Sequence, residues 1–212
     1  MIKHSGWDMR EERLIKKFDK QAKMYQKKVE DRTMAMWRKE LISEAYGNVL
    51  EVGGGAGANF PYYEKENVRV TGLDFSPKMI ELAKETASNY QIRANFIEGN
   101  VEAVEFAANS FDFIVSTLTL CSYTNPVATL NKFSRWCKPN GKILLLEHGL
   151  SSNRFLSVMQ KMIDPLFVQV SGCHCNRDIY QILEASALQT IRSDRYWQNI
   201  IYLVRARPIK NS

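Results

Sequence analysis

The sequence of 212 residues lacks any uninterrupted apolar run of about 18 or more residues, the length that a membrane-spanning helix needs. Its first stretch, MIKHSGWDMREERLIKK, is charged from the start and lacks the apolar core of a signal peptide. We therefore expect a soluble protein of the cytoplasm. Internal repeats and low-complexity segments are also absent, and the length suits one globular domain with an appended arm.

Cysteine is scarce, and the four cysteines are Cys121, Cys137, Cys173 and Cys175. Their spacing is not that of a disulfide framework, and a chain of this length does not need one. Cys173 and Cys175 flank His174, but structural zinc sites use four ligands, usually with two residues between paired cysteines. The Cys-His-Cys run lacks that spacing and has no second cluster. No metal site is predicted.

Proline is missing from residues 8–46, where apolar residues recur in steps of three and four, as on one face of a helix. We predict a helical arm over residues 1–46, either continuous or broken near residues 31–33. Its other faces are rich in Lys and Arg. Packing against its own domain is the favoured interpretation, and peripheral contact with a membrane surface or a partner is the alternative.

Positive charge exceeds negative charge, with 29 Lys and Arg against 23 Asp and Glu and a net charge of +6. This balance permits contact with nucleic acid or anionic lipid, although a basic, soluble surface is the simpler interpretation. Aromatic and basic residues do not interleave in any segment, as a stacking platform for a single strand would require. Nucleic acid is therefore not the expected partner.

From residue 48 onward, short apolar runs alternate with helical stretches. The predicted strands are 48–52, 68–74, 95–98, 112–117 and 142–148, and the end of the chain, LQTIRSDRYWQNIIYLVRARP, reads as two further strands. Alternation of this kind indicates βαβ units and a mostly parallel sheet covered on both faces. We predict a Rossmann-like, doubly wound α/β fold over residues 47–212, seven-stranded, with an antiparallel C-terminal hairpin.

Residues 150–187 interrupt this rhythm and are predicted to form an insertion that acts as a lid. Apolar residues dominate its first part; they are Phe155, Leu156, Val158, Met159, Met162, Ile163, Leu166, Phe167 and Val168. If the insertion covers a cleft, the pocket beneath it is apolar and suits a lipophilic small molecule. The alternative is that these side chains simply belong to the core.

The run VLEVGGGAGANF, residues 49–60, has four glycines directly after an apolar stretch. A glycine-rich turn between a strand and a helix lets the backbone approach a ligand, and the start of the helix adds unpaired N–H groups. The run therefore predicts a site for a nucleotide-type cofactor. Gly53, Gly55 and Ala58 also fit the dinucleotide fingerprint, so the motif alone leaves the cofactor open.

Polar residues follow the next two strands. Asp74 ends the strand 68–74, where a carboxylate can accept hydrogen bonds from both ribose hydroxyls of a nucleoside. It could instead cap the next helix, but Ser76 is better placed for that. Asn100 follows the third strand, where its carbonyl oxygen could accept from an adenine amine while the Val101 N–H donates to the ring. An ordinary turn is an equal interpretation of Asn100.

At this point the sequence resembles the class I S-adenosylmethionine-dependent methyltransferases. The matching segments occur in the family's order over about residues 48–148; they are VLEVGGGAG, VTGLDFSPKMIELAK, FIEGNVEAVEF, FDFIVSTLTLCSY and FSRWCKPNGKILLLEH. More narrowly, the pattern is similar to the ubiquinone/menaquinone-type branch. It is most similar to the small alkyl-thiol methyltransferases of the methyltransferase-like family, through TLTLCS, EH, DP and GC to about residue 175.

The resemblance implies S-adenosyl-L-methionine as methyl donor and S-adenosyl-L-homocysteine as product. In the family, the acidic residue before the glycines lies near the methionine amino group, the residues after the second strand hold the ribose and cover the adenine, and the end of the fourth strand contacts the methionine portion. Carried over by resemblance, the cofactor-binding residues are Tyr25, Glu51, Gly53, Gly55, Asp74, Phe75, Asn100, Val101, Thr117 and Leu118. For Tyr25, a place in the apolar helical stripe is the alternative.

Two positions depart from the family's pattern. The family usually has a carboxylate where this chain has Asn100. An amide oxygen can still accept a hydrogen bond from adenine, but without the charge, so we expect weaker cofactor binding. Gly54 is often a cysteine or another residue in relatives, and we expect glycine at this position to be harmless.

Methyl transfer from a sulfonium is an in-line displacement with a neutral leaving group, so the protein's main task is to position donor and acceptor. At most, a base must accept a proton. One candidate is His148, which ends the strand 142–148 at the edge where ligands collect. The other is Asp164, whose apolar neighbours in KMIDPLFV are expected to raise its pKa. The alternatives are a histidine that only bonds backbone and a cap or turn before Pro165.

The sequence thus predicts an S-adenosylmethionine-dependent methyltransferase that acts on a small, hydrophobic acceptor, such as a thiol, a quinone precursor or a lipid. Two alternatives stay open. One is a methyltransferase directed at RNA, which the basic arm would serve. The other is a protein that binds S-adenosylmethionine without catalysis, because the set of catalytic candidates is small.

Overall fold

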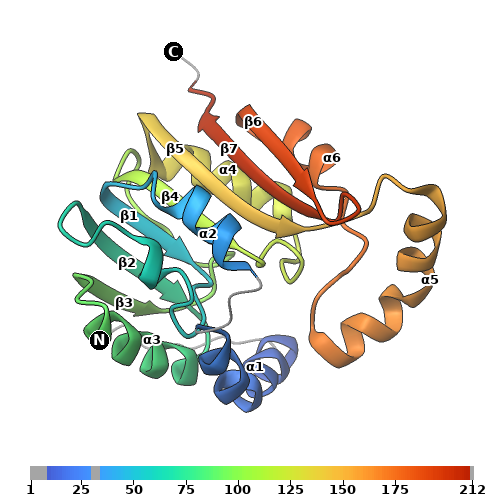
Figure 1. Ribbon diagram of the computed structural model, residues 1–212, viewed down its shortest axis with the longest axis horizontal. Coiled ribbons are helices and arrows are strands. Elements are labelled where there is room, and N and C mark those ends of the chain that lie inside the picture. Colours follow the sequence, from blue (N-terminus) through green and yellow to red (C-terminus); the bar gives the residue numbers. More distant parts are fainter. Residues whose placement is uncertain (1–8, 30–33, 211–212) are drawn as a thin grey trace.

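A computed structural model describes residues 9–29 and 34–210 (Figure 1). Seven strands form one sheet in the order β3-β2-β1-β4-β5-β7-β6, in which β7 runs antiparallel to β5 and β6 and the other pairs are parallel. The strands are β1 (Gly47–Val52), β2 (Val68–Asp74), β3 (Ala94–Glu98), β4 (Phe111–Thr117), β5 (Cys137–His148), β6 (Leu188–Tyr196) and β7 (Ile201–Pro208). The predicted doubly wound sheet with a C-terminal hairpin is confirmed.

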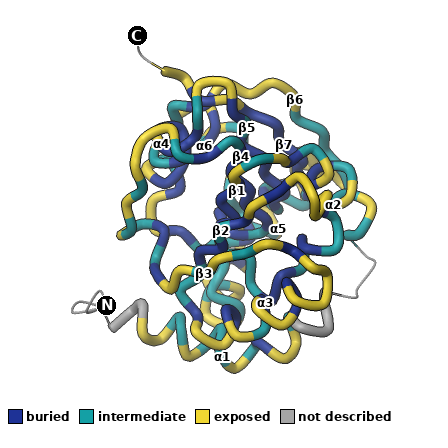
Figure 2. Tube along the Cα trace, turned by 90° about the vertical axis from the view of Figure 1, so that its left-hand side faces the viewer, coloured by how far each residue is buried: buried dark blue, intermediate teal, exposed yellow. Residues whose placement is uncertain are grey.

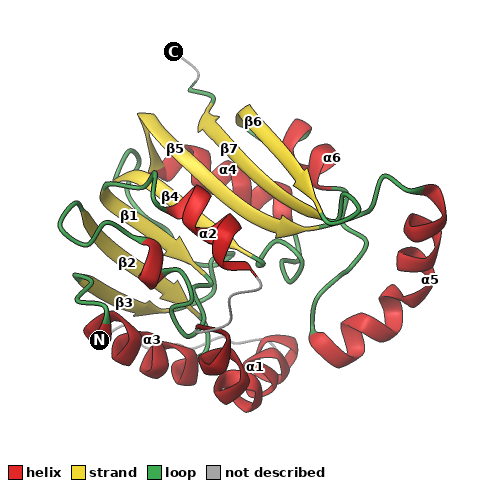
Figure 3. Cartoon of the chain, viewed as in Figure 1, coloured by secondary structure: helices red, strands yellow, loops and turns green. Residues whose placement is uncertain are grey.

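The helices occupy the predicted stretches (Figure 3). They are α1 (Met9–Val29), α2 (Ala35–Ile42), α3 (Pro77–Asn89), α4 (Pro126–Trp136), α5 (Arg154–Ser171) and α6 (Ile179–Glu184), with a short 3-10 turn, η2 (Phe60–Tyr62). The predicted break at residues 31–33 lies outside the described residues, and the structure shows a helix on each side of it. Within the described residues, the arm comprises the helices α1 and α2.

Local chemistry explains where the central helices begin. Pro77 and Pro126 each stand in a first helical turn, where a missing N–H breaks no hydrogen bond. Ser76 caps α3 by accepting a hydrogen bond from the Met79 N–H at 3.1 Å. Asn125 caps α4 in the same way through the Ala128 N–H at 3.0 Å. These starts place the N-termini of α3 and α4 at the carboxyl ends of the strands that precede them.

Each face of the sheet carries its own apolar core, because successive side chains of a strand point to opposite faces. On one face, Leu50 and Ile114 pack with residues of α4 and α6. On the other, Val49 and Phe113 pack with residues of α2 and α3. Figure 2 shows the buried strands at the centre, with exposed surface on the outer sides of α1 and α3. This two-sided burial fixes the strand ends that carry the site.

The described helices of the arm contact the rest of the chain at several points. Leu41 and Ile42 of α2 are fully buried against the sheet. The α1 side of the arm is attached by Phe18, whose ring meets that of Phe75 edge to face at 5.3 Å. The Ser76 hydroxyl also donates to Asp19 Oδ1 at 2.6 Å. Helix α1 is thereby held beside the start of α3, and α2 is held on one face of the sheet.

Helix α5 departs from this pattern and stands away from the sheet at one end of the molecule (Figure 1). Asp164 is its only buried residue. Its exposed large apolar residues are Phe155, Val158, Met159, Met162, Ile163, Leu166, Phe167 and Val170. The alternative in which residues 150–176 belong to the core is therefore wrong for this helix, because it lies beyond the end of the sheet. No helix among residues 9–29 and 34–210 is both long and apolar enough to cross a bilayer.

Candidate functional site

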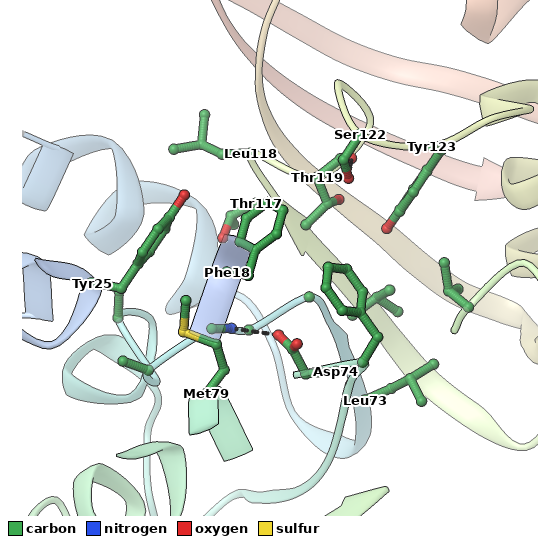
Figure 4. Close-up of a pocket in the computed structure, with 18 of the residues that line it drawn as sticks. Phe18, Tyr25, Leu73, Asp74, Met79, Thr117, Leu118, Thr119, Ser122 and Tyr123 are labelled. Carbon is green, nitrogen blue, oxygen red and sulfur yellow. Dashed lines mark hydrogen bonds between the residues drawn. The ribbon is translucent and has the colours of Figure 1, made fainter. Parts of the chain in front are cut away.

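A cavity opens at the carboxyl ends of β1, β2 and β4, at the edge where parallel sheets of this kind bind ligands (Figure 4). Its walls come from α1, α2, the glycine loop at residues 53–58, the end of β2 and the loop at residues 117–123. Of the predicted cofactor residues, the cavity is lined by Tyr25, Gly53, Gly55, Asp74, Phe75, Val101, Thr117 and Leu118. The topology thus brings together residues that lie almost 100 positions apart in sequence.

The glycine loop forms one wall with its backbone. Gly53 and Gly55 adopt φ of +60° and +54°, values that side chains disfavour. A Cβ on Gly53 would lie 2.5 Å from the Thr119 methyl carbon. The Gly53 N–H donates to the Leu73 carbonyl at 2.8 Å, which fastens the loop to the end of β2. The wall therefore needs glycine both for its path and for the close approach of its neighbours.

Asp74 is the last residue of β2 and holds the glycine loop in place. Its Oδ2 accepts from the Gly55 N–H at 3.1 Å, and its Oδ1 accepts from the Ser76 N–H at 2.9 Å. Burial raises the pKa of Asp74 to about 6, against those two hydrogen bonds and a third from the Phe75 backbone. Since Ser76 caps α3, the cap interpretation of Asp74 does not apply. Its carboxylate faces the cavity, where the predicted ribose contact stays a prediction.

Glu51 lies behind the glycine loop rather than on the cavity surface. Its Oε2 accepts from the Tyr63 hydroxyl at 2.7 Å and its Oε1 from the Asn59 amide at 3.1 Å. Complete burial raises the pKa of Glu51 to about 7. A Cβ on Gly54 would lie 2.8 Å from Glu51 Oε1. Glycine therefore fits this packing, because a side chain at position 54 would meet a carboxylate that is held on both oxygens.

Arg38 of α2 also lines the cavity, although no motif in the sequence singles it out. Its guanidinium donates to Asn59 Oδ1 and, at 3.3 Å, to the Thr117 hydroxyl. Burial lowers the pKa of Arg38, although the group keeps its charge at neutral pH. Asn59 connects this cation to Glu51, so a positive and a negative group sit at the same end of the cavity. That pair suits a ligand with an ammonium and a carboxylate.

Aromatic side chains of α1 form the opposite wall. Phe18 and Tyr25 lie seven residues apart, which puts them on one helix face, and both reach the cavity (Figure 4). Burial raises the pKa of Tyr25 to about 12, so its hydroxyl stays protonated. The two interpretations of Tyr25 are thus compatible, since it is both a stripe residue and a cavity residue. Phe18 was predicted only as part of the stripe.

After β3, the neighbouring residues Val101 and Asn100 differ in their position relative to the cavity. Val101 is buried and lines the cavity. Asn100 is not among the lining residues; its Oδ1 accepts from the Glu102 N–H at 2.9 Å, and its backbone carbonyl accepts from two further N–H groups. Asn100 thus accepts the hydrogen bonds of the turn that follows β3. A contact with adenine would need the second lone pair of the same oxygen and stays a prediction.

Glu147, which is not among the predicted site residues, holds the loop after β4 in a strained shape. Leu118 has φ of +58°, which is costly for a branched side chain. The Thr119 N–H donates to both oxygens of Glu147 at 3.1 Å, and the Leu120 N–H donates to Glu147 Oε1 at 3.3 Å. Burial raises the pKa of Glu147 to about 8. Its signal was a lone carboxylate in the buried run ILLLEH.

His148 ends β5 beside Ile201 of β7. Burial lowers its pKa, so the ring is neutral at pH 7 and able to accept a proton. It does not belong to the described lining of the cavity. The structure thus places His148 at the predicted edge, and its role as a base stays a prediction.

The expectation of a raised pKa for Asp164 is wrong. Burial alone would raise it, but the His174 ring bonds to Oδ2 at 2.8 Å, the Cys175 N–H donates to Oδ1 at 2.7 Å, and together they hold the pKa of Asp164 below its usual value. Pro165 continues the same helix, so Asp164 is neither a cap nor a turn residue. It ties α5 to the loop at residues 172–175. All of 150–187 is described, and none of it lines the cavity.

The chain matches the family described as "Methyltransferase domain" over residues 50–145. It is 30% identical to "Methyltransferase OMS1, mitochondrial" of Saccharomyces cerevisiae over 74% of this chain and 37% of that protein. It is also 30% identical to human "Thiol S-methyltransferase TMT1B", over 78% of this chain and 72% of that protein. The same identity relates it to "Ubiquinone/menaquinone biosynthesis C-methyltransferase UbiE" of Shewanella pealeana, over 61% and 54%.

Solved structures share the fold. One is a chain of the complex between the Haloferax volcanii Trm112 methyltransferase activator and a methyltransferase, with a TM-score of 0.70 at 17% identity, covering 96% of this chain and 99% of that one. Another is the PH0226 protein of Pyrococcus horikoshii OT3, with a TM-score of 0.65 at 19% identity over 84% and 92%. This chain spans less than two thirds of the yeast and Shewanella relatives and most of the human one.

Proposed function

This chain belongs to the class I S-adenosylmethionine-dependent methyltransferases, and on that basis we propose that it transfers a methyl group to a small, hydrophobic acceptor. The family uses S-adenosyl-L-methionine as donor. Human and rat relatives are named for thiol methylation and the Shewanella relative for a quinone. The observation that carries the proposal is the cavity with Asp74 at one end of the glycine loop and Arg38 at the other.

The residues of the cavity fit this cofactor. Gly53 and Gly55 leave free a space that side chains would fill. Asp74 presents a buried carboxylate, which would accept from ribose hydroxyls. Phe75 and Val101 offer the apolar surface that an adenine would need. When bound, S-adenosylmethionine supplies a methyl group that its sulfonium has already activated, so these residues have only to bind and orient.

The Arg38 end of the cavity would hold the amino-acid portion. Its guanidinium would bind the carboxylate, and the Glu51 carboxylate behind the loop would favour the ammonium. Asn59 is buried and forms hydrogen bonds with both Arg38 and Glu51, which fixes their positions relative to each other. The site thereby matches both charges of a free amino acid.

Replacement of Arg38 with alanine is expected to weaken S-adenosylmethionine binding by about 1–2 kcal/mol, through loss of a charge-assisted hydrogen bond. Titration calorimetry measures the change. Lys39→Ala is the matched control, because Lys39 is the next residue of α2 and is exposed. Equal affinities of the two variants would remove Arg38 from the proposed site.

Cofactor affinity is expected to fall as pH is lowered from 8 to 5. In the free protein, burial raises the pKa of Asp74 to about 6 and that of Glu51 to about 7. The bound cation and the ribose hydroxyls favour the ionised carboxylates, so binding should release protons near pH 6.5. Calorimetry in buffers of different ionisation enthalpy counts those protons. Proton uptake at that pH would contradict the assignment.

The same shifts predict how stability depends on pH. A carboxyl whose pKa is raised on folding adds stability below its unfolded pKa, near 4, and loses it as pH rises through its folded pKa. For Asp74 and Glu51 the loss falls between about pH 4 and pH 7. Bound cofactor would offset it at neutral pH.

A proton on the acceptor, where there is one, would pass to a base, and we propose His148 for that role with Asp164 as the alternative. His148→Ala is expected to lower turnover of a thiol or phenol by about tenfold to a hundredfold with cofactor affinity unchanged. The two quantities come from steady-state assays and calorimetry on the same sample. An unchanged rate would exclude His148 and leave Asp164, acting through His174.

The acceptor class is tested by incubating the protein with labelled S-adenosylmethionine and a panel of apolar thiols, quinols and phenols. Transfer of label to one of them supports the proposal. Label that passes only to RNA would favour the RNA-directed alternative, and tight binding without any transfer would favour a non-catalytic protein.

We also propose that the basic arm contacts a membrane surface, since Arg13, Lys16, Lys20 and Lys23 of α1 are exposed.

A further inference from the structure

The apolar side of α5 forms one unbroken stripe on the outside of the molecule. Its exposed residues follow steps of three and four from residue 155 to residue 170, as on a single helix face. Met162 is 76% exposed and Leu166 is 65% exposed. At 1.5 Å per residue, the 18 residues of the helix extend about 27 Å. A stripe of this kind normally faces a core, so its outward orientation calls for a partner.

The orientation of α5 is fixed from its polar side. Gln160 donates to the carbonyls of Gly149 and Cys175 at 3.1 and 2.9 Å and accepts from the Ser151 N–H at 2.9 Å. One turn further along the same face, the buried Asp164 bonds to the His174 ring and the Cys175 N–H. These five hydrogen bonds hold the polar face toward the body. The apolar stripe must therefore point away from it.

The cationic surface of α1 adjoins the end of this stripe. Lys17 donates to the carbonyls of Gln169 and Val168 at 2.6 and 3.4 Å, in the last turn of α5, where a cation also suits the helix dipole. Around Lys17, a shallow depression is lined by Arg13, Lys16 and Lys20. The last turn of α5 and the cationic depression of α1 thus meet at Lys17.

We propose that α5 and α1 dock the protein on an anionic lipid bilayer. The stripe would lie at the boundary between headgroups and acyl chains, and Arg13, Lys16, Lys20 and Lys23 would face the anionic headgroups. Interfacial helices combine these two features, and basic residues near such a surface are attracted to its anionic lipids. The stripe is a protruding ridge and not a groove, which suits a deformable partner. A second copy, stripe against stripe, would bring together two sets of the same cations.

This docking also defines the acceptor class, and that part rests on the proposed function. Helix α1 is shared by both sites: Phe18 and Tyr25 line the cavity, and Lys17, beside Phe18, touches α5. A molecule dissolved in the bilayer would reach the cavity along α1 without crossing water. The acceptor would be a compound that partitions into membranes.

The test is sedimentation with vesicles of phosphatidylcholine alone and of phosphatidylcholine with phosphatidylserine. The wild type is expected to bind the second kind, and less so as salt rises. The double variant Met162→Glu/Leu166→Glu should lose binding by about tenfold or more, because its new charges would enter the apolar boundary. Lys16→Glu/Lys20→Glu should lose it on anionic vesicles. Ile191→Glu, at an exposed apolar site on β6, is the control and should bind as the wild type.

Three outcomes would overturn the proposal: no binding of the wild type to anionic vesicles, equal binding of the α5 double variant, or sedimentation of the wild type as a dimer that this variant converts to a monomer. Calorimetry with S-adenosylmethionine on the same samples separates this inference from the proposed function. Unchanged cofactor affinity with no vesicle binding removes only the docking surface. Absent cofactor binding in the wild type removes the proposed function and the acceptor class that rests on it, and leaves the docking surface.

Discussion

Asp74→Ala is expected to weaken S-adenosylmethionine binding by about 2–3 kcal/mol, which is a loss of thirtyfold or more in affinity. Under the proposed function, the carboxylate would offer both ribose hydroxyls a charged acceptor. It also holds the Gly55 N–H at 3.1 Å, so its removal loosens the wall on which the cofactor would rest. Two sources of affinity are thereby lost together. Calorimetry with both the methyl donor and its demethylated product measures the effect.

Two further variants make this test specific. Asp74→Asn keeps the size of the side chain and one acceptor oxygen, so it should fall between wild type and alanine. Glu98→Ala is the matched control, because Glu98 ends β3 as Asp74 ends β2 but is exposed. An affinity of Asp74→Ala equal to that of Glu98→Ala would show that the ribose has been placed wrongly.

Glu147→Ala is expected to lower the free energy of unfolding by about 3–5 kcal/mol. The carboxylate is fully buried and accepts from the backbone N–H groups of Thr119 and Leu120 as well as from the hydroxyls of Ser116 and Thr119. Alanine would leave these donors without an acceptor in a dry interior, beside a loop that already holds Leu118 at a positive φ. Urea unfolding of the free protein measures the loss.

The isosteric Glu147→Gln separates hydrogen bonding from packing. It keeps one acceptor oxygen for the Thr119 and Leu120 N–H groups, so we expect a loss of about 1–2 kcal/mol. It should also retain cofactor binding, because the loop at residues 117–123 keeps its course. If alanine and glutamine destabilise equally, the backbone donors do not depend on this side chain.

Much of the cavity could be predicted because its residues follow directly from strand ends. Asp74, Val101 and Thr117 each come at or just after an apolar run, and parallel topology brings those ends to one edge. The sequence pattern and the fold therefore carry the same information there. The glycine loop adds its own signal, since positive φ at Gly53 and Gly55 restricts the residue type.

Other site residues could not be predicted because their role depends on how helices pack. Arg38 is one of many cations in the arm, and only the docking of α2 turns it into the cavity. Phe18 has the periodicity of a packed helix whichever ligand lies beneath it. The stripe of α5 shows the same limit: its spacing specifies an apolar face but not whether that face meets protein or lipid.

The prediction of a raised pKa for Asp164 was wrong for a related reason. Apolar neighbours in sequence suggested a dry carboxyl with a raised pKa. Its partners, His174 and the Cys175 N–H, come from a loop about ten residues further on, and their hydrogen bonds outweigh the burial. A local sequence window does not contain that contact. It becomes visible only once α5 and the loop are placed together.

The central claim is that this cavity binds S-adenosylmethionine and delivers its methyl group to a small, apolar acceptor. The most direct measurement is a turnover assay with methyl-labelled S-adenosylmethionine, the acceptor panel and anionic vesicles, in wild type and Asp74→Ala. We predict label in an apolar thiol, quinol or phenol with the wild type, and loss of most of that signal in the variant at limiting cofactor. Cofactor that binds the wild type tightly while its label reaches none of these acceptors, or reaches RNA alone, would contradict the account.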